Sequence, residues 1–278
     1  HPNLQQLPNY SDIGTGIRSI FQPEEGCDWG CFDYSQQEPR LVLHYAAETP
    51  GITGLSSTLE EFNAKGSEAD FHKIVAKMAK IERKEAKTIN LGLFYGMGKA
   101  KLQTQLGIND TEKATELLNN YHQRVPFVKQ LIKNVMDRAQ KRGRVRTLLG
   151  RMCRFDLWEP KQFGMHKAMG FQQACDEIGQ GNIKRAYTYK ALNKLIQGSA
   201  ADMTKKAMAD LYDEGITPMI QLHDELDISV ENDAQAKKIK DIMENVVELR
   251  VPNKVDYEKG SNWGSIESEE EGLDENFF

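Results

Sequence analysis

One face of a predicted helix carries polar and aromatic side chains in a regular order. The residues recur at every fourth position, and they are Arg83, Lys87, Leu91 and Tyr95. A helix rises about 1.5 Å per residue, so this spacing aligns two cations, an apolar side chain and a phenol over roughly 18 Å. Cations bind phosphates and aromatic rings stack on bases, so the order matches that of a nucleoside triphosphate. The alternative is a basic amphipathic helix that faces water.

Two acidic residues far apart in the sequence lie at the ends of predicted strands. Asp33 is near the end of a strand over residues 29–34, and Asp224 is at the tip of a hairpin formed by strands 218–222 and 226–230. Carboxylates at adjacent strand ends can hold two Mg²⁺ ions, which also bind substrate phosphates, and such a pair of ions suits phosphoryl transfer. The alternative for residues 223–225 is an ordinary polar turn.

The elements around these residues follow from turn residues and apolar periodicity. The first 26 residues are predicted as loop, and a helix over 40–47 follows the first strand. A glycine-rich link over 51–66 leads to a helix over 71–95. The remaining predicted helices span 111–141, where Thr111 begins and Gly143 stops the pattern, most of 165–211, and 234–248.

The distribution of charge indicates a polyanionic partner. The formal net charge is −5, but six acidic residues and no basic residue follow Gly264, and without them the rest of the chain carries +1. Seven lysine and arginine residues and no acidic residue occur between Arg138 and Arg154. Such a block is typical of a surface that binds a polyanion.

The sequence gives no sign of a membrane or of an oxidising compartment. It has no stretch of about 18 uncharged apolar residues and no basic and apolar leader, so we expect a cytoplasmic protein of a bacterial cell without membrane contact. The four cysteines, Cys27, Cys31, Cys153 and Cys175, form no CxxC pair. We therefore predict that all four are reduced thiols.

Three segments resemble, in order, motifs A, B and C of the family A DNA polymerases. They are Asp33-Tyr34-Ser35-Gln36-Gln37-Glu38-Pro39-Arg40, residues 83–96, and Gln221-Leu222-His223-Asp224-Glu225. Further matches are Pro2-Asn3-Leu4-Gln5, Asp70-x-His72, Thr147-x-x-Gly150-Arg151, Asn193-x-x-x-Gln197-Gly198-x-Ala200-Ala201-Asp202 and Asn262-Trp263. The resemblance covers residues 1 to about 264.

The resemblance implies an α+β right-hand fold and template-directed addition of deoxynucleotides to a primer 3′-hydroxyl. The palm, an antiparallel sheet with helices, would comprise residues 1–55 and 186–264, and the helical fingers residues 56–185. Residues 265–278 would be an acidic disordered tail. The family's thumb and exonuclease domain are absent from these 278 residues, so we expect upstream sequence or a second polypeptide to supply the thumb.

The resemblance also implies which residues carry the chemistry. Asp33 and Asp224 would bind two Mg²⁺ ions together with the Tyr34 carbonyl, and Glu225 would support this site. Lys87 would protonate the leaving pyrophosphate. These assignments place the reaction at the strand ends.

The incoming deoxynucleotide (dNTP) would be held by a second group of residues. They are His72, Arg83, Lys87, Leu91, Tyr95 and Glu38. Arg83, Lys87 and His72 would bind the triphosphate, and Leu91 would face the sugar. Glu38, hydrogen-bonded to Tyr95, would be the steric gate that excludes a 2′-hydroxyl.

A third group would contact the primer-template DNA. Its members are Arg40, Gly96, Arg151, Asn193, Gln197 and His223. Three alternatives to these assignments stay open: His72 is a satisfied surface histidine, Gln197 only caps or packs, and Arg151 only pairs with a nearby acid.

The chain departs from the family pattern in several places. Gln37 and Pro39 replace aliphatic residues in motif A, and Pro39 biases Glu38 away from helical geometry. Leu91 stands where the family usually has Phe or Tyr. The segment between His72 and Arg83 is shorter than in bacterial polymerase I, which indicates the phage replicative branch.

Two other functions agree with parts of the sequence. A single-subunit RNA polymerase is one, although Glu38 argues against it. A catalytically weak DNA-binding remnant is the other, although retention of Asp33, Asp224, Arg83 and Lys87 argues against it. The acidic tail ends in Phe277 and Phe278 and is a candidate peptide for a replication protein, with a solvated disordered end as the alternative.

Overall fold

The computed structural model describes residues 4, 7, 11–162, 164 and 166–266. The acidic tail from residue 267 onward, for which a partner is predicted, lies outside the described residues. Contacts within the chain divide it into two compact units. Unit 1 comprises residues 1–35, 204–247 and 254–278, and unit 2 comprises residues 36–203 and 248–253.

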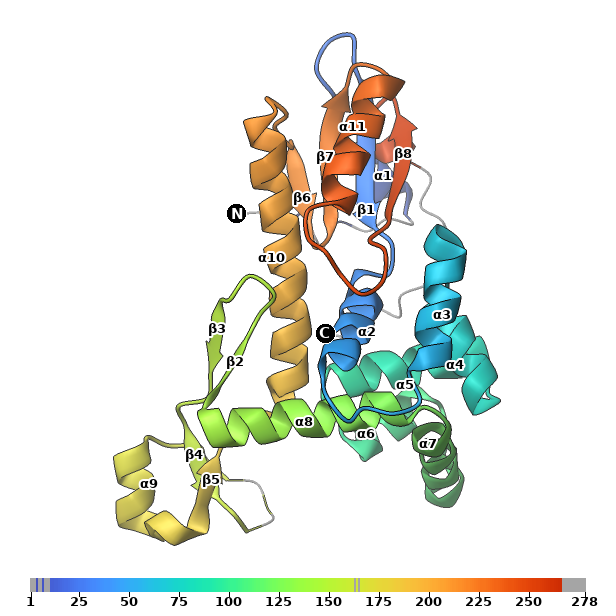
Figure 1. Cartoon of the computed structure of the whole chain (residues 1–278). Coiled ribbons are helices and arrows are strands. Elements are labelled where there is room, and N and C mark those ends of the chain that lie inside the picture. The colour runs from blue at the N-terminus through green and yellow to red at the C-terminus, as the bar shows by residue number, and fades with distance from the viewer. Residues whose placement is uncertain (1–3, 5–6, 8–10, 163, 165, 267–278) are drawn as a thin grey trace. The chain divides into compact units, whose positions relative to one another are not determined.

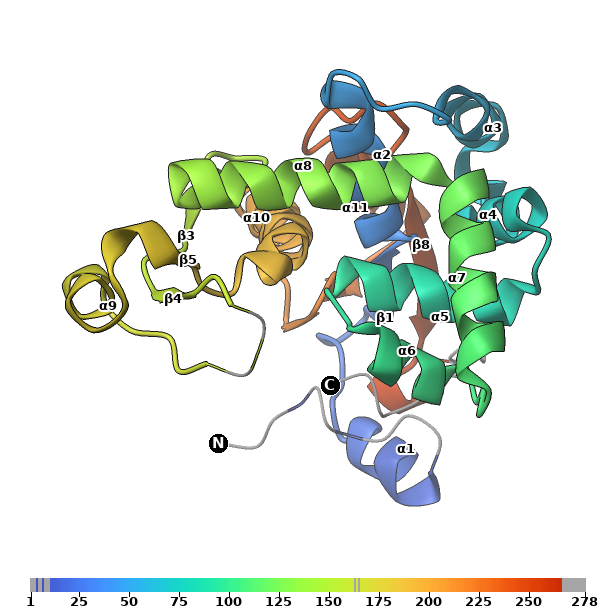
Figure 2. The ribbon, with the colours of Figure 1, turned by 90° about the horizontal axis from the view of Figure 1, so that it is seen from below.

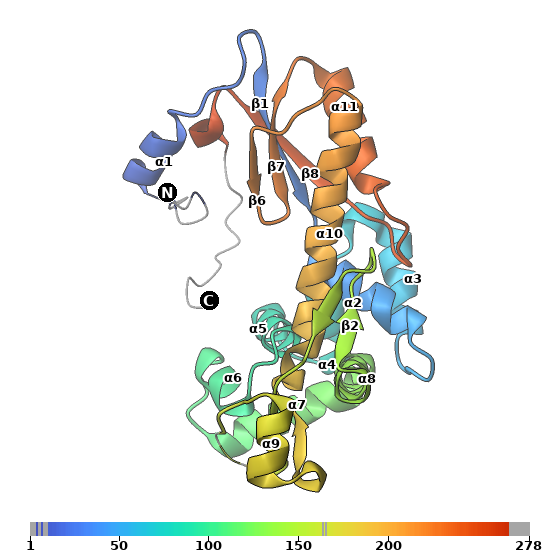
Figure 3. The same cartoon turned by 90° about the vertical axis from the view of Figure 1, so that its left-hand side faces the viewer.

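Unit 1 is built on a four-stranded antiparallel sheet. Its strands are β1 (Asp28–Tyr34), β6 (Ile220–Leu222), β7 (Glu225–Val230) and β8 (Val255–Gly260), in the order β6-β7-β1-β8. Figure 3 shows this order, with β1 between β7 and β8. The register places Asp33 directly opposite Glu225 on one side and Asp256 on the other.

The two faces of this sheet differ in polarity because successive side chains of a strand point to opposite faces. One face is apolar, and Phe32, Leu226 and Ile228 are fully buried there. Helix α11 (Asp233–Glu244) covers this face, and the Tyr34 hydroxyl donates a hydrogen bond of 2.9 Å to the Met243 carbonyl (Figure 1). The other face carries Asp33 and its neighbours.

Aromatic residues close one end of the polar face. Trp263, in the 3₁₀ turn η5 (Trp263–Ser265), stacks on Trp29 with ring centroids 6.2 Å apart. The guanidinium of Arg18, at the end of α1 (Asp12–Arg18), lies 4.3 Å from the Trp263 ring. The Asn262-Trp263 motif therefore anchors α1 to the sheet.

Unit 2 is mainly helical. Its helices are α2 (Gln37–Glu48), α3 (Ser56–Lys65), η2 (Gly66–Glu68), α4 (Phe71–Ala79), α5 (Arg83–Phe94), α6 (Lys99–Gln105), α7 (Thr111–Arg124), α8 (Pro126–Arg142), α9 (Phe171–Ile178), η3 (Gln180–Asn182), η4 (Thr188–Lys190) and the first part of α10 (Ala191–Asp213). Figure 2 shows α4, α5 and α7 gathered near the beginning of α8. Phe71 is central to their core, because its ring contacts those of Phe62, Phe94 and Phe127.

Two short hairpins complete unit 2. Strands β2 (Arg144–Arg146) and β3 (Met152–Arg154) form the first, and β4 (Trp158–Pro160) and β5 (Ile183–Arg185) form the second. Gly143 ends α8 with a left-handed φ of 68°, and a Cβ there would lie 2.6 Å from the Arg185 guanidinium carbon. The left-handed backbone therefore favours glycine, and a side chain there would displace the Arg185 guanidinium.

Several predicted elements are confirmed. The first strand, the β6–β7 hairpin and the helix at its C-terminal side occur where they are predicted, with ends shifted by a few residues. The start at Thr111 and the stop at Gly143 are also correct, but the helix predicted between them is two helices, α7 and α8, divided at Val125. All four cysteines are free.

Other predictions are wrong. The helix predicted over 71–95 is two helices, because Lys80 adopts a left-handed φ of 56° and Glu82 starts α5 with a capping box to Glu85. The predicted loop over the first 26 residues contains α1, the predicted link over 51–66 contains α3, and the segment 165–211 contains β5. Strand β8 has no counterpart in the sequence-based prediction. In the described part of the chain, no helix is both long enough and apolar enough to cross a bilayer.

Candidate active site

The predicted carboxylates meet at one end of the sheet in unit 1. Asp33 lies opposite Glu225 in the β1–β7 ladder, and Asp224 precedes Glu225 in the tight turn after β6. His223 makes this turn possible by adopting a left-handed φ of 53°. Two segments distant in sequence thus supply three carboxylates to one place.

Burial and mutual repulsion make these carboxylates hard to ionise together. Burial raises the pKa of Asp33, and the neighbouring carboxylates of Asp224 and Glu225 raise it further. Burial also raises the pKa of Asp224 and that of Glu225. A divalent cation between them would remove the repulsion that favours their protonated forms.

A second layer of polar residues lies beside this group and was not predicted. Cys31, Glu225 and Asp227 each place one potential ligand atom within 4.8 Å of the others. Asp227 is completely buried and accepts a hydrogen bond of 3.1 Å from the Trp29 indole nitrogen. Burial, followed by the Glu225 carboxylate, raises the pKa of Asp227. The alternation Trp29-x-Cys31-x-Asp33 was the available signal, since it places all three on one face.

The residues at the strand ends fit a magnesium site. Asp33 and Asp224 offer only oxygen, the donor that Mg²⁺ prefers, and the raised pKa values indicate a position that favours added positive charge. The Tyr34 side chain points to the opposite face, toward Met243. The Tyr34 contribution to metal binding through its carbonyl stays a prediction.

The stripe of residues that is predicted to bind the nucleotide is on α5 in unit 2. Arg83, Lys87, Leu91 and Tyr95 are all half-buried, as expected for residues that share one helix face. The Arg83 Nε atom donates to the Asp70 carboxylate at 2.8 Å, and Asp70 also caps α4 by accepting from the Lys73 amide. Burial would raise the pKa of Asp70, but the hydrogen bonds from Lys73 and Arg83 outweigh it and lower that pKa. The Asp70-x-His72 motif thus positions Arg83.

His72 is buried, with only 6% of its surface exposed, so the alternative of a surface histidine is wrong. Its Nδ1 atom lies 3.0 Å from the Asn90 amide nitrogen, and the Tyr121 hydroxyl donates to the Asn90 amide oxygen. This chain of contacts joins α4, α5 and α7. A triphosphate contact by His72 stays a prediction.

The predicted hydrogen bond between Tyr95 and Glu38 is present. The Tyr95 hydroxyl donates to Glu38 Oε2 at 3.1 Å. Glu38 lies in the first turn of α2, so the predicted bias of Pro39 against helical geometry is wrong; a first turn tolerates proline because its N–H groups have no helical acceptor. Gln36 precedes this turn with a left-handed φ of 51°, and its side chain bonds the Ala69 carbonyl and the Phe71 amide.

Arg40 lies in the interior of unit 2. It is 1% exposed, and its guanidinium donates to the Pro252 carbonyl at 2.6 Å and to the Gly66 carbonyl at 3.4 Å. A primer contact by Arg40 stays a prediction, and it would require the guanidinium to leave these carbonyls.

The motif around Arg151 and the motif on α10 bind each other. Arg151 pairs with Asp202 at 2.9 Å and donates to the Gly198 carbonyl at 2.6 Å. The Leu148 amide donates to Ser199 Oγ. A Cβ at Gly198 would lie 2.6 Å from Thr147 Cγ2, so only glycine permits this approach. Figure 1 shows β2 and β3 lying along α10.

The ion pair between Arg151 and Asp202 confirms the pairing considered for Arg151. A DNA contact by Arg151 stays a prediction.

The other predicted DNA contacts lie on several elements. Asn193 and Gln197 lie one turn apart on α10, so they share a face. Gly96 follows α5 with a φ of 69°. His223 belongs to unit 1, whereas the other predicted DNA contacts belong to unit 2.

The predicted residues therefore form two groups. Unit 1 brings together Asp33, Asp224 and Glu225. Unit 2 carries the α5 stripe together with Glu38 and His72.

Comparison with protein families gives one match over almost the whole chain. Residues 1–265 match the family model described as DNA polymerase family A. The chain is 36% identical over 302 residues to a DNA-directed DNA polymerase of Pseudomonas phage M6, covering 95% of this chain and 42% of that protein. It is 32% identical to DNA polymerase I of Bacillus caldotenax, covering 94% of this chain and 29% of that protein.

A solved structure is similar in fold. It is the POL domain of Pol1 from M. smegmatis in complex with DNA primer-template and dNTP, with a TM-score of 0.73 and 30% sequence identity. The match covers 95% of this chain and 45% of that one. The chain thus spans less than half the length of these relatives.

Proposed function

Because the chain belongs to DNA polymerase family A, we propose that it carries the polymerising core of a DNA-directed DNA polymerase. The reaction is template-directed addition of a deoxynucleotide to a primer 3′-hydroxyl, with release of pyrophosphate. The observation that supports it best is the convergence of Asp33, Asp224 and Glu225 at one end of the sheet.

Two Mg²⁺ ions are the cofactor that fits this site. Asp33, Asp224 and the Tyr34 carbonyl would hold them, and Glu225 would support Asp33 across the ladder. When bound, such ions activate an attacking oxygen and neutralise the charge of the leaving group. The raised pKa values of the carboxylates mean that binding the ions would release protons.

The residues of unit 2 would bind the nucleotide. Arg83 and Lys87 neutralise the triphosphate, and Lys87 gives a proton to the leaving pyrophosphate. Leu91 and Tyr95 face the sugar and the base. Glu38, held by Tyr95, leaves no room for a 2′-hydroxyl.

The proposed activity also divides the chain into a palm and fingers. The palm would comprise residues 1–55 and 186–264 and the fingers residues 56–185. We propose that the protein acts in phage or bacterial DNA replication with a thumb supplied by upstream sequence or another polypeptide. A catalytically weak remnant is not favoured, because both metal carboxylates and both phosphate-binding cations are retained.

Single-nucleotide extension of a labelled primer tests the proposal. Protein and primer-template are mixed at concentrations high enough to offset weak duplex binding, and each dNTP is offered alone with Mg²⁺. The expected result is addition of only the nucleotide complementary to the template base. Absence of any template-dependent addition, with the protein shown to be folded, would refute the proposed activity.

A further inference from the structure

Two tyrosines and a lysine are presented together on a turn of unit 2 that no predicted function uses. Tyr187 and Tyr189 lie at η4, and they are 40% and 47% exposed. The Lys190 ammonium lies 5.7 Å from the ring centroid of each tyrosine. Exposed aromatic faces beside a cation are the elements that bind the bases and the phosphates of single-stranded nucleic acid.

The turn is held rigidly from beneath. Gln140 of α8 donates to the Arg185 carbonyl at 2.8 Å and to Thr188 Oγ1 at 2.7 Å, and it accepts from the Arg185 amide at 3.0 Å. Thr188 is buried between the two exposed tyrosines. The backbone that carries Tyr187 and Tyr189 is thereby held in place, which lowers the entropic cost of binding a ligand to their side chains.

The backbone of the turn is strained at an aromatic residue. Tyr187 adopts a φ of 59° and a ψ of 14°, a left-handed conformation that bulky residues rarely adopt. Such strain costs on the order of 1 kcal/mol or more and is concentrated at functional sites. Glycine at this position would avoid the strain.

The turn lies beside the end of α5. A Cβ at Gly96 would meet the Tyr189 carbonyl oxygen at 2.8 Å, so the two backbones are in direct contact. Tyr95 and Gly96 are the residues proposed to face the base of the incoming nucleotide and the template. Tyr189 is therefore next to Gly96, the residue that is proposed to contact the template.

The surrounding segment is strongly basic. Residues 138–194 contain thirteen lysine and arginine residues and four acidic residues, a net charge of +9. On the β2–β3 hairpin, exposed Arg144 lies directly opposite exposed Arg154, and in the described part of the chain neither has an acidic partner within ion-pair distance. Like charges placed opposite each other destabilise a hairpin unless an anion lies between or beside them.

From these observations we propose that Tyr187, Tyr189 and Lys190 form a stacking platform for unpaired bases of single-stranded DNA. This inference rests on the proposed polymerase function, in which the occupant is the template strand ahead of the primer end. Unpaired bases are required because only they expose a face to a tyrosine ring, whereas duplex DNA exposes edges and phosphates.

Direct binding of a single-stranded oligonucleotide tests the platform without catalysis. A fluorescein-labelled oligothymidylate of about 12 nucleotides is titrated with the 278-residue chain, and anisotropy is followed at several salt concentrations. We expect Tyr189→Ala and Tyr187→Ala each to weaken binding about tenfold, and Tyr189→Phe to retain most of the affinity. Lys190→Gln should reduce the slope of affinity against salt by about one ion.

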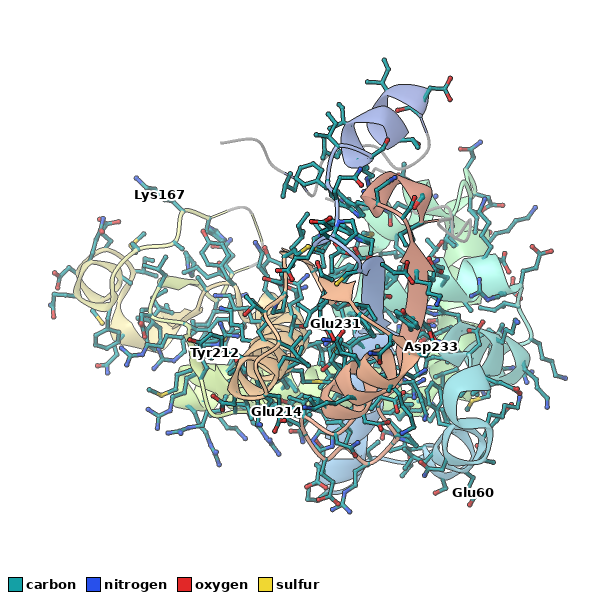
Figure 4. The ribbon with its side chains drawn as sticks, turned by 90° about the horizontal axis from the view of Figure 1, so that it is seen from above. Glu60, Lys167, Tyr212, Glu214, Glu231 and Asp233 are labelled. Atoms are coloured by element: carbon teal, nitrogen blue, oxygen red, sulfur yellow. The ribbon has the colours of Figure 1, made fainter. Side chains whose placement is uncertain are left out.

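Two matched substitutions test whether the loss of any exposed tyrosine or lysine weakens binding. Tyr212, labelled in Figure 4, is 69% exposed at the far end of α10, and Lys205 is an exposed lysine of the same helix. Tyr212→Ala and Lys205→Gln should bind the oligonucleotide as the parent chain does. Thermal unfolding of every variant shows that its fold is intact.

The outcomes separate this proposal from the proposed function. If folded Tyr187→Ala and Tyr189→Ala bind the oligonucleotide as tightly as the parent while the parent extends primers, the platform is refuted and the polymerase activity stands. If the tyrosine variants lose binding but the parent extends no primer, the platform stands and the activity fails. If the parent chain binds no oligonucleotide at all, the platform is also refuted.

Discussion

The Tyr95 hydroxyl donates a hydrogen bond to Glu38 Oε2 at 3.1 Å, which ties the end of α5 to the first turn of α2. The carboxylate is thereby held in one orientation by a neutral donor. Glu38 therefore has a fixed position, which a group that selects substrates by steric exclusion requires.

Replacing Glu38 with alanine should relax the selection against ribonucleotides. The side chain that would collide with a 2′-hydroxyl is removed, so incorporation of a ribonucleotide relative to a deoxynucleotide should rise by about 100-fold. Single-nucleotide extension with the two substrates measures the ratio. An unchanged ratio would show that Glu38 does not face the sugar.

Tyr95→Phe serves as the milder companion change. It removes one hydrogen bond, worth about 1 kcal/mol, while Glu38 remains. The relative use of ribonucleotides should therefore rise by only about fivefold. A larger effect than that of Glu38→Ala would place the gate at Tyr95 instead.

Replacing either Asp33 or Asp224 with asparagine should abolish primer extension and leave DNA binding nearly unchanged. Each substitution removes a metal-bound charge rather than a DNA contact, so the rate should fall by about 10³-fold or more. Asp213→Asn, an exposed aspartate of the same unit, is the control. An asparagine variant with more than about a tenth of the parent rate would contradict the two-metal assignment.

Without divalent cations, the carboxylates at the sheet end should destabilise unit 1 as pH rises. Burial, and the carboxylates of Asp224 and Glu225, raise the pKa of Asp33, so the folded chain binds more protons than the unfolded chain above about pH 4. The free energy of unfolding therefore falls with rising pH through this range. Asp33→Asn should remove part of the loss and be more stable than the parent at pH 8 by on the order of 1 to 3 kcal/mol.

Urea unfolding in chelator at pH 5 and pH 8 measures this effect. The difference between parent and Asp33→Asn should shrink at pH 5 and reverse when Mg²⁺ is added at pH 8, because only the parent retains the full ligand set. Equal pH dependence of the two proteins would show that Asp33 is not desolvated.

Leu91→Tyr should admit chain terminators. In the family, a tyrosine at this position can offer its hydroxyl in place of the missing 3′-hydroxyl of a dideoxynucleotide, and leucine has no such group. We expect discrimination to relax by roughly 1.5 kcal/mol or more, about tenfold upwards, mostly in the relative rate of addition. If the tyrosine variant excludes dideoxynucleotides as strongly as the parent, Leu91 does not face the sugar.

Gly198→Ala should destabilise unit 2, although alanine normally favours a helix. The new methyl group would lie 2.6 Å from Thr147 Cγ2, and such overpacking costs about 1 to 3 kcal/mol. Thr147→Ser removes that methyl group and keeps the hydroxyl, so the double variant should recover most of the loss. Chemical unfolding of the four proteins gives the coupling energy, and a coupling near zero would contradict the close contact.

Much of the sheet in unit 1 is predictable because its two inner strands have strong local patterns. The strand with Asp33 and the hairpin with Asp224 read as strands bounded by turn residues, and their antiparallel pairing then brings the carboxylates together. Strand β8 is not predictable in this way. Its sequence, Val255-Asp256-Tyr257-Glu258-Lys259-Gly260, is polar because only one of its faces is covered.

The sequence does not predict the positions of residues whose partners are distant in sequence. Nothing local indicates that Asp227 is buried against Trp29, or that the Arg40 guanidinium bonds the Pro252 carbonyl. The break at Lys80 is similar, because a lysine in a left-handed conformation has no sequence signal as strong as glycine. The spacing of motifs predicts the candidate site residues, and tertiary packing determines their hydrogen-bond partners.

The sheet order has a consequence for the synthesis of this protein. Strand β1 is synthesised well before both of its neighbours in the sheet, β7 and β8. The hydrogen-bonded pair Trp29 and Asp227 is separated by 198 residues. Most of unit 2 is one continuous stretch between them and can fold first. During that time β1 has two unpaired edges and exposes the apolar side chains of Trp29 and Phe32, which makes the nascent chain prone to aggregate. Asp33 and Asp224 can therefore come together only after β7 has been synthesised, so a chain that ended before β7 would lack the proposed metal site.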